Sequence, residues 1–125
     1  MKNFYFLFLG VLFLASCSKD DDNCSSKTFE EVVIGSWNIQ ILGQTLSQVT
    51  IKSDGTYTDD GGEDLISVGS NTTSRTWAIS GKTLTFTVKD ASGDEGETFF
   101  NYSSHTCDNI VFEENLFGQI TFKRK

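Results

Sequence analysis

In residues 76–88 the chain reads Thr76-Trp77-Ala78-Ile79-Ser80-Gly81-Lys82-Thr83-Leu84-Thr85-Phe86-Thr87-Val88. Apolar and polar side chains alternate on both sides of Ser80-Gly81-Lys82, which is a turn signal because glycine accepts a positive φ. In the second arm the larger apolar side chains share one face and the threonines share the other, as in a half-buried strand. This segment therefore predicts an antiparallel β-hairpin.

Other short segments show the same alternation, and turn residues separate them. Ser53-Asp54-Gly55, for example, is a tight-turn signal before a strand that opens at Tyr57. Proline, which would exclude a central strand, is absent, and no stretch has the period of a long helix. Besides the hairpin, we expect strands at 37–41, 49–51, from Tyr57 onward, and at 65–68, 98–102, 110–112 and 117–123, with acidic loops at 59–63 and 90–96, a polar run at 69–74 and a turn near Glu114-Asn115.

About eight short antiparallel strands joined in order predict an all-β protein with an up-and-down meander. Such a sheet hides its edges by closing into a small barrel. A two-sheet β-sandwich is the alternative, because alternation alone does not distinguish the two. Before the first strand, Thr28-Phe29-Glu30-Glu31 has the pattern of a capping box and Gly35 follows the next apolar residues, which predicts one short helical turn.

The alternation also identifies the side chains expected to face the barrel interior. Many of them are large, which favours a filled interior over a deep pocket. The candidate ligand-binding residues are Ile39, Ile41, Tyr57, Trp77, Phe86, Phe112 and Phe122, and the other expected inward residues are Val49, Ile51, Ile79, Leu84, Val88, Ile110 and Ile120.

Gly35-Ser36-Trp37, which follows the helical turn, resembles the G-x-W signature of lipocalins. Residues 53–57 and the hairpin around Trp77 also resemble the short lipocalin-like domains of Bacteroidota lipoproteins. The resemblance implies a barrel in which Trp37 closes one end and Arg124 packs across its ring, with Lys123 as a poorer substitute. The chain is much shorter than a typical lipocalin, which argues against a roomy cavity.

The N-terminal segment resembles the signal of a bacterial lipoprotein. Its apolar stretch, Phe4–Leu14, has roughly 11 residues, whereas a membrane span needs ~20. Leu14-Ala15-Ser16-Cys17 resembles a lipobox, which implies acyl chains on Cys17; a plain secretory signal with an incidental cysteine is the alternative. The domains expected from this resemblance are a signal peptide at 1–16, a lipidated flexible tether at 17–27 and the barrel at 28–125.

The location of the protein follows from the residues after the lipobox. Asp20-Asp21-Asp22 resembles the export signal that sends Bacteroidota lipoproteins to the outer face of the outer membrane. The resemblance therefore implies an outer-membrane protein that is anchored by lipid and exposed at the cell surface.

Two cysteines, Cys24 and Cys107, remain once Cys17 carries lipid. An even pair in an exported protein favours a disulfide between them. A metal site would need more Cys or His at ligand spacing, and His105 is the only histidine. A catalytic thiol would need that histidine across a cleft, whereas His105 precedes Cys107 by only two positions.

Residue types that carry chemistry are few. Ser103, Ser104, His105 and Asp108 supply the types of a hydrolytic triad, but they crowd one short segment, whereas a triad needs partners from separate elements. We therefore expect no catalytic residues, no metal site and no cofactor. The alternative is calcium held by an acidic loop without EF-hand spacing, at Asp59, Asp60, Glu63 and Asp64.

Two classes of function fit these observations. The first is an envelope-anchored lipocalin-like protein that binds a small apolar ligand in the barrel or at its mouth. The second is a non-enzymatic accessory protein that binds another envelope protein through its outer face or loops. A net charge of −7 with scattered bases repels phosphate backbones and excludes nucleic acid as a partner.

Overall fold

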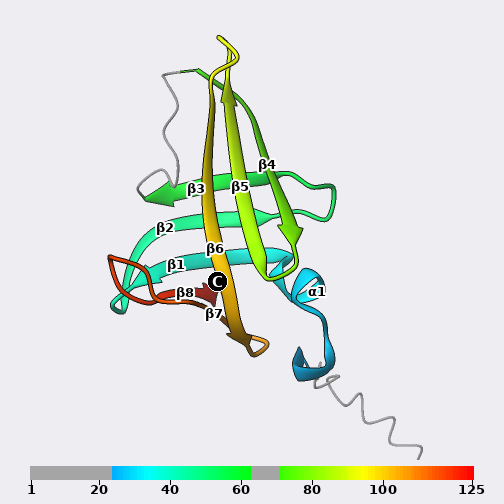
Figure 1. Ribbon diagram of the computed structural model, residues 1–125, viewed down its shortest axis with the longest axis vertical. Helices are drawn as coiled ribbons and strands as arrows, with labels where there is room; N and C mark the ends of the chain where they lie inside the picture. The colour runs from blue at the N-terminus through cyan, green and yellow to red at the C-terminus, as the bar shows by residue number, and fades with distance from the viewer. Residues whose placement is uncertain (1–23, 63–70) are drawn as a thin grey trace, which may run out of the picture.

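A computed structural model describes residues 24–62 and 71–125, and it shows an all-β protein in which eight antiparallel strands form one nearly closed, barrel-shaped sheet (Figure 1). The barrel expected from the alternation is therefore confirmed. The strands are β1 (Gly35–Ile41), β2 (Gln44–Ile51), β3 (Tyr57–Gly62), β4 (Thr72–Ser80), β5 (Thr83–Asp90), β6 (Glu95–His105), β7 (Asn109–Phe112) and β8 (Ile120–Arg124), and they follow a 3-10 helix, η1 (Cys24–Ser26), and a short helix, α1 (Phe29–Val33).

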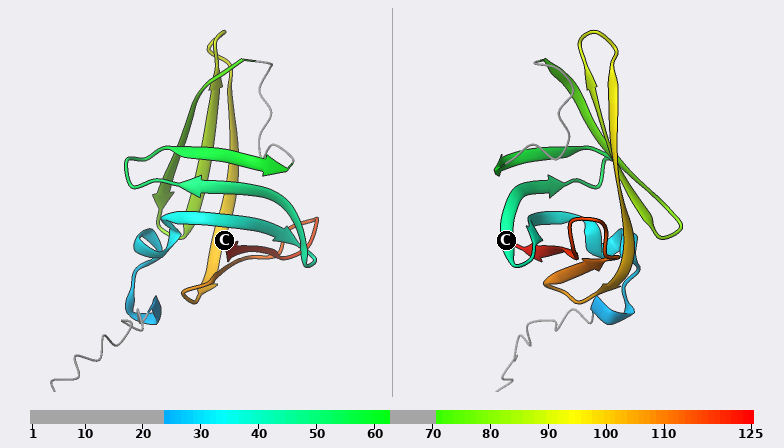
Figure 2. Two further views of the ribbon diagram at one scale, coloured as in Figure 1. Left: turned by 180° about the vertical axis from the view of Figure 1, so that it is seen from behind. Right: turned by 60° about the vertical axis from the view of Figure 1, so that its left-hand side comes forward.

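The sheet curls because its first and last strands pair. The strand order is β3-β2-β1-β8-β7-β6-β5-β4, so β1 lies between β2 and β8 and the two edge strands are β3 and β4. The edges meet where Thr56 bridges Thr76 and the Trp77 amide donates to the Gly55 carbonyl at 2.9 Å. Figure 2 shows β4, β5 and β6 crossing the other strands steeply. The place where the two edges meet is called the seam.

The long strand β6 joins the two halves of the barrel. Its first part, residues 95–101, pairs with β5, and its last part pairs with β7 as far as His105. Glu113 donates a backbone hydrogen bond to Asn101 at 2.7 Å, and beyond this point a loop (113–119) leads from β7 into β8. The first half of β6 therefore faces this loop instead of β7.

Several boundaries differ from those expected. Asp59–Gly62 continues β3 rather than forming a loop, because it pairs with β2. Glycine suits the last two positions, since Gly61 and Gly62 adopt positive φ values and a Cβ on Gly62 would collide with the backbone of Leu46 and Ser47. β4 begins at Thr72 and so includes residues expected in a polar loop. β5 continues to Asp90, and β6 already begins at Glu95. Phe117 lies in the loop before β8, and the strand expected at 65–68 lies outside the described residues.

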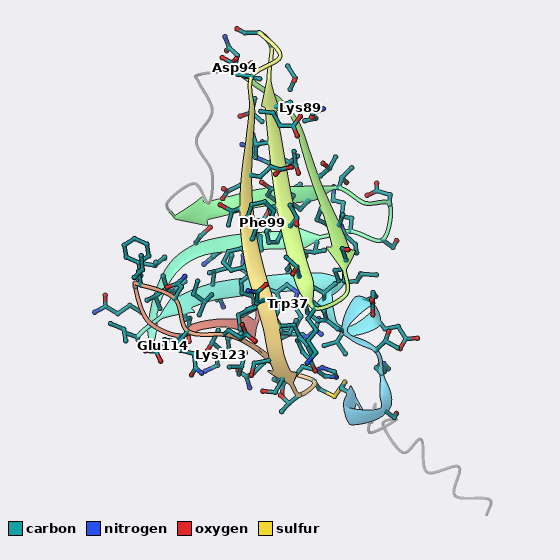
Figure 3. The ribbon with its side chains drawn as sticks, viewed as in Figure 1. Trp37, Lys89, Asp94, Phe99, Glu114 and Lys123 are labelled. Carbon is teal, nitrogen blue, oxygen red and sulfur yellow. A yellow bond between two sulfur atoms is a disulfide. The ribbon has the colours of Figure 1, made fainter. Side chains whose placement is uncertain are left out.

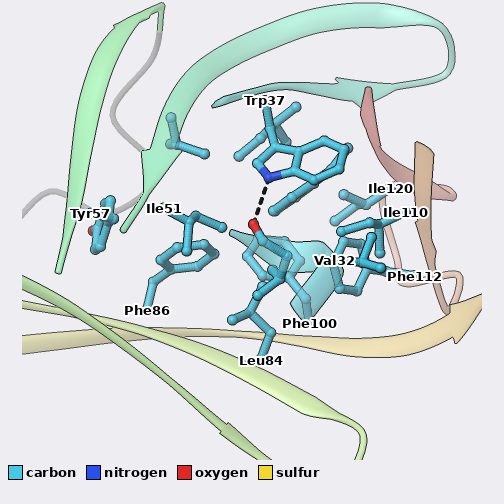
Figure 4. Packing of buried hydrophobic residues seen from close by; sticks show 14 of the residues in the cluster. Val32, Trp37, Ile51, Tyr57, Leu84, Phe86, Phe100, Ile110, Phe112 and Ile120 are labelled. Atoms are coloured by element: carbon cyan, nitrogen blue, oxygen red, sulfur yellow. Dashed lines mark hydrogen bonds between the residues drawn. The ribbon is translucent and has the colours of Figure 1, made fainter. Parts of the chain in front are cut away.

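Aromatic side chains fill the middle of the barrel (Figure 4). Phe86, Phe100, Phe112 and Phe122 pack against one another with ring centroids 4.7–6.3 Å apart, mostly edge to face or tilted. This geometry suits the ring quadrupoles and leaves little empty space. The interior was expected to be filled, and in this region it is.

The chain before β1 closes one end of the barrel. The Thr28 hydroxyl accepts from the Glu31 amide and the Glu31 carboxylate accepts from the Thr28 amide, which is the expected capping box, and α1 buries Phe29, Val32 and Val33. Cys24 forms a disulfide with Cys107, with 5.0 Å between the Cα atoms, so the expected pairing is confirmed. η1 places a buried Cys24 against the barrel, so the disulfide ties this part of the expected tether (17–27) to the domain.

Candidate functional site

The two ends of the barrel differ in structure. At the end covered by α1, Trp37 is 0% exposed and its indole nitrogen donates to the Val33 carbonyl at 2.7 Å (Figure 4). Arg124 lies over the same ring, with Cζ 4.0 Å from the ring centroid. This is the arrangement that the lipocalin resemblance implied, and it seals this end.

Arg124 also joins the elements around Trp37. Its guanidinium donates to the carbonyls of Val32 and Ile34 at 3.2 and 3.3 Å, and to that of Cys107 at 3.0 Å. It thereby satisfies carbonyls at the end of α1 that have no partner within the helix. Burial lowers the pKa of Arg124, and the nearby charge of Asp108 opposes that shift. The site also explains Gly35: a Cβ there would collide with the guanidinium.

The opposite end holds an open pocket of about 490 Å³. It lies between β1, β2 and β8 on one side and the first half of β6 with the loop 113–119 on the other (Figure 3). Its volume is in the range of small-molecule sites, and most of its lining is apolar. The lining residues are Ile39, Ile41, Leu46, Ser47, Glu97, Thr98, Phe99, Phe100, Asn115, Phe117 and Ile120.

Ser47 is the buried polar side chain of this pocket. Its residue is 2% exposed, and its hydroxyl has no hydrogen-bond partner among the described residues. On β2 it occupies the same inward row as Val49 and Ile51. A buried hydroxyl without a partner costs free energy, so its presence in an apolar row requires an explanation.

The candidate ligand-binding residues divide between the pocket and the core. Ile39 and Ile41 line the pocket. Trp77 is half-buried near the seam, and its indole donates to the Lys52 carbonyl at 2.8 Å. The remaining four, Tyr57, Phe86, Phe112 and Phe122, are buried in the core and do not line the pocket.

Sequence reasoning missed several pocket residues. Ser47 continues the alternation of Val49 and Ile51 by one step, so extending the predicted strand would have placed it inside. Phe99 and Phe117 were expected in strands but not at a pocket. Both are exposed and line the pocket, and this depends on where the sheet leaves the barrel open. Local periodicity carries no information about that opening.

The polar segment around His105 has structural hydrogen bonds. His105 Nε2 lies 2.7 Å from the Cys24 carbonyl oxygen and therefore donates to it, so in the neutral ring Nδ1 accepts from the Tyr102 hydroxyl at 2.7 Å. Both ring nitrogens are thus engaged. The side chains of Ser103, Ser104 and Asp108 are exposed. Cys107 forms the disulfide with Cys24 and therefore has no free thiol.

The acidic residues considered for calcium are only partly described, since Glu63 and Asp64 lie outside the described residues. Asp60 accepts from the hydroxyls of Thr50 at 2.5 Å and Thr58 at 2.7 Å. Burial raises the pKa of Asp60, but these hydrogen bonds outweigh it and the net pKa is lowered. Within the described part of the chain, no three His, Cys, Asp or Glu side chains gather closely enough to hold a metal ion.

None of the helices within residues 24–62 and 71–125 has the length and hydrophobicity that a transmembrane span requires. The chain matches no family model, no curated protein and no solved structure.

Proposed function

We propose that this protein is a lipid-anchored, lipocalin-like binding protein of the bacterial envelope, which holds a small apolar ligand in the open pocket. The observation that carries the proposal is an open, mostly apolar pocket of about 490 Å³. Pockets of this size with few polar groups are typical small-molecule sites. The Trp37 and Arg124 pair supports the lipocalin-like part of the proposal, since it closes the end of the barrel opposite to the pocket.

Binding in the pocket is tested by filling it. Ile41→Trp places a larger side chain on the pocket wall at the end of β1, where Ile41 is only half-buried. We expect it to weaken binding of a neutral apolar dye about tenfold or more, because the dye loses the cavity, while the fold is retained. Fluorescence titration of the purified protein measures the dye affinity.

The control lies away from the pocket. Ser104 is exposed on β6, pairs with Val111 and does not line the pocket, so Ser104→Trp should leave dye affinity unchanged. Equal affinities for Ile41→Trp and the unmodified protein would contradict binding in this pocket.

Anchoring rests on the sequence, because Cys17 and Asp20–Asp22 lie outside the described residues. Cys24 follows Cys17 by seven residues, which span at most roughly 25 Å at about 3.3–3.6 Å per extended residue, so lipid on Cys17 would hold the disulfide-bonded barrel near the membrane. We expect Cys17→Ala to release or mislocalise the protein, as judged by cell fractionation, because it removes the acyl chains. Replacement of Asp20, Asp21 and Asp22 by Ala should retain anchoring but protect the protein from extracellular protease. Unchanged membrane attachment of Cys17→Ala would contradict the lipoprotein assignment.

A second candidate is the binding of another envelope protein through the rim of the pocket. Leu42, Leu116 and Phe117 are 81%, 99% and 75% exposed, and Leu42 lies against Gly118 of the loop. Leu42 also has φ of 51°, a conformation that is rare for a side chain of this kind. Figure 1 shows the β1–β2 turn beside this loop, away from α1. Clusters of exposed apolar side chains are typical of interaction sites.

A further inference from the structure

We propose that the first half of β6 is a docking edge for an extended peptide segment of a partner protein, which pairs with it as an added β-strand. The segment has apolar side chains at alternate positions, which enter the open pocket, and basic residues at its ends. Such recognition goes beyond a small-molecule site, because the β6 backbone contributes as well as the pocket lining. The direction of the β6 backbone, the wall of the pocket and the charge around it support this docking mode.

The backbone groups of β6 alternate between its two sides, as in any strand. The Tyr102 amide donates to the Lys82 carbonyl at 2.7 Å, on the side of β5. The Asn101 carbonyl accepts from the Glu113 amide at 2.7 Å, on the opposite side. Since the pairing with β5 is regular over residues 95–101, the odd-numbered residues of this stretch turn their backbone groups away from β5.

The N–H and C=O groups of Glu97 and Phe99 therefore lie on an open sheet edge. β7 pairs with β6 only over residues 102–105, and no described strand pairs with residues 95–100 on the side away from β5. In Figure 1 the first half of β6 lies above β7 and above the loop that follows β7. An unpaired edge of this kind is a template for an extended chain, whose backbone completes the hydrogen bonds.

This edge is also a wall of the open pocket. The lining includes Thr98 and Phe100 from the inward row of β6, and Glu97 and Phe99 from the exposed row. Because neighbouring residues of a strand point to opposite faces, both rows border one pocket where the pocket runs along the edge of the strand. An added strand here would direct alternate side chains at the apolar lining from β1 and β8, and the others outward beside Phe99, which is 61% exposed.

The charge around the edge selects the partner. Glu97 lies on the edge itself, and Glu113 and Glu114 are exposed on the loop that borders the pocket. No Lys, Arg or His is among the described lining residues, and the whole chain has a net charge of −7. A segment with basic ends is attracted to this edge, whereas a second copy of the same acidic chain is repelled.

The experiment measures binding of a fluorescein-labelled peptide, KVTVTVK with blocked termini, by fluorescence anisotropy. The protein is residues 17–125 with Cys17→Ser, which contains every described element. The peptide alternates valine with threonine and has a lysine at each end. We expect it to bind at least about tenfold more tightly than EVTVTVE, because glutamate at both ends meets the acidic edge.

N-methylation of the peptide tests the backbone hydrogen bonds. The amides of alternate residues in a strand face the same neighbour, so either the valine amides or the threonine amides donate to β6, but not both sets. Methylation of one set should weaken binding at least about tenfold, whereas methylation of the other set should change it less than about threefold. A peptide held only by its side chains would not distinguish the two sets.

Two variants of Phe99 test the same hydrogen bonds from the side of the protein. Phe99→Pro removes the ring and the edge N–H, and Phe99→Ala, the matched control, removes only the ring. Proline is tolerated where the N–H points away from the sheet, so the pairing with β5 should be retained. We expect Phe99→Pro to bind KVTVTVK at least about tenfold more weakly than Phe99→Ala, with equal affinities of the two variants for the dye N-phenylnaphthylamine.

Equal peptide affinities of two folded Phe99 variants, or equal effects of the two methylation patterns, would overturn strand addition. If Phe99→Pro does not fold, the methylated peptides decide. Dye binding without peptide binding would overturn the docking edge and leave the small-molecule site, whereas peptide binding without dye binding would support the edge and overturn that site. A dimer of the free protein in analytical ultracentrifugation that the peptide dissociates would assign the edge to a second copy and overturn the proposed partner.

Discussion

Trp37→Ala is expected to lower the free energy of unfolding by roughly 3–5 kcal/mol, the range for truncation of a large core aromatic. The Trp37 ring is fully buried and packs near Phe122, with 6.5 Å between ring centroids. The variant would also leave the Val33 carbonyl without its indole donor and Arg124 without the ring on which it stacks. Denaturant unfolding followed by circular dichroism measures the loss.

The second tryptophan provides a matched control. Trp77 is half-buried near the seam, and its indole also donates to one backbone carbonyl. Trp77→Ala should therefore cost less, about 1–2 kcal/mol, although the same atoms are removed. Trp37→Phe keeps an aromatic ring but lacks the N–H group, and its loss should be intermediate. Equal losses for the two alanine variants would contradict the role of Trp37 as the buried closure of the barrel.

Removal of the disulfide is the other large effect. Cys24→Ala combined with Cys107→Ala should cost roughly 4–5 kcal/mol in the chain-entropy treatment, because the bridge spans a sequence separation of 83 residues and restricts the unfolded chain. Alanine is preferred to serine because Cys24 is buried, and a hydroxyl there would add its own cost. The midpoint of denaturant unfolding measures the change.

A reductant provides the control for the disulfide. It should destabilise the unmodified protein and leave the double variant unchanged, because only the former has a bond to reduce. The hydrogen bond from His105 goes to the backbone carbonyl of residue 24, a group that the double variant retains, so the two proteins differ chiefly in the sulfur bridge. A loss below about 1 kcal/mol would contradict the prediction, since it would place the bridge far under the usual 2–5 kcal/mol.

Local signals in the sequence predicted much of the fold. The alternation in residues 83–88 placed Leu84, Phe86 and Val88 on the buried face, and the structure buries all three. Thr28 and Glu31 predicted the short capped helix. These features depend on near neighbours in the chain, whose geometry follows from strand and helix periods. Loops were predicted less well: Asp59–Gly62 reads as a loop by composition, yet pairing with β2 makes it a strand.

The sequence by itself determined the all-β class, the inward rows, the Cys24–Cys107 pair and the residues that close the barrel at Trp37. Only the tertiary structure decided where the barrel is filled and where it is open. Ser47 is two positions from Val49 in the same inward row, yet Ser47 lines a pocket and Val49 does not. The pocket forms because only the last part of β6 pairs with β7, whereas the first part lies beside the loop 113–119. A side chain's row follows from the period of its own strand, whereas its partners are supplied by strands distant in sequence.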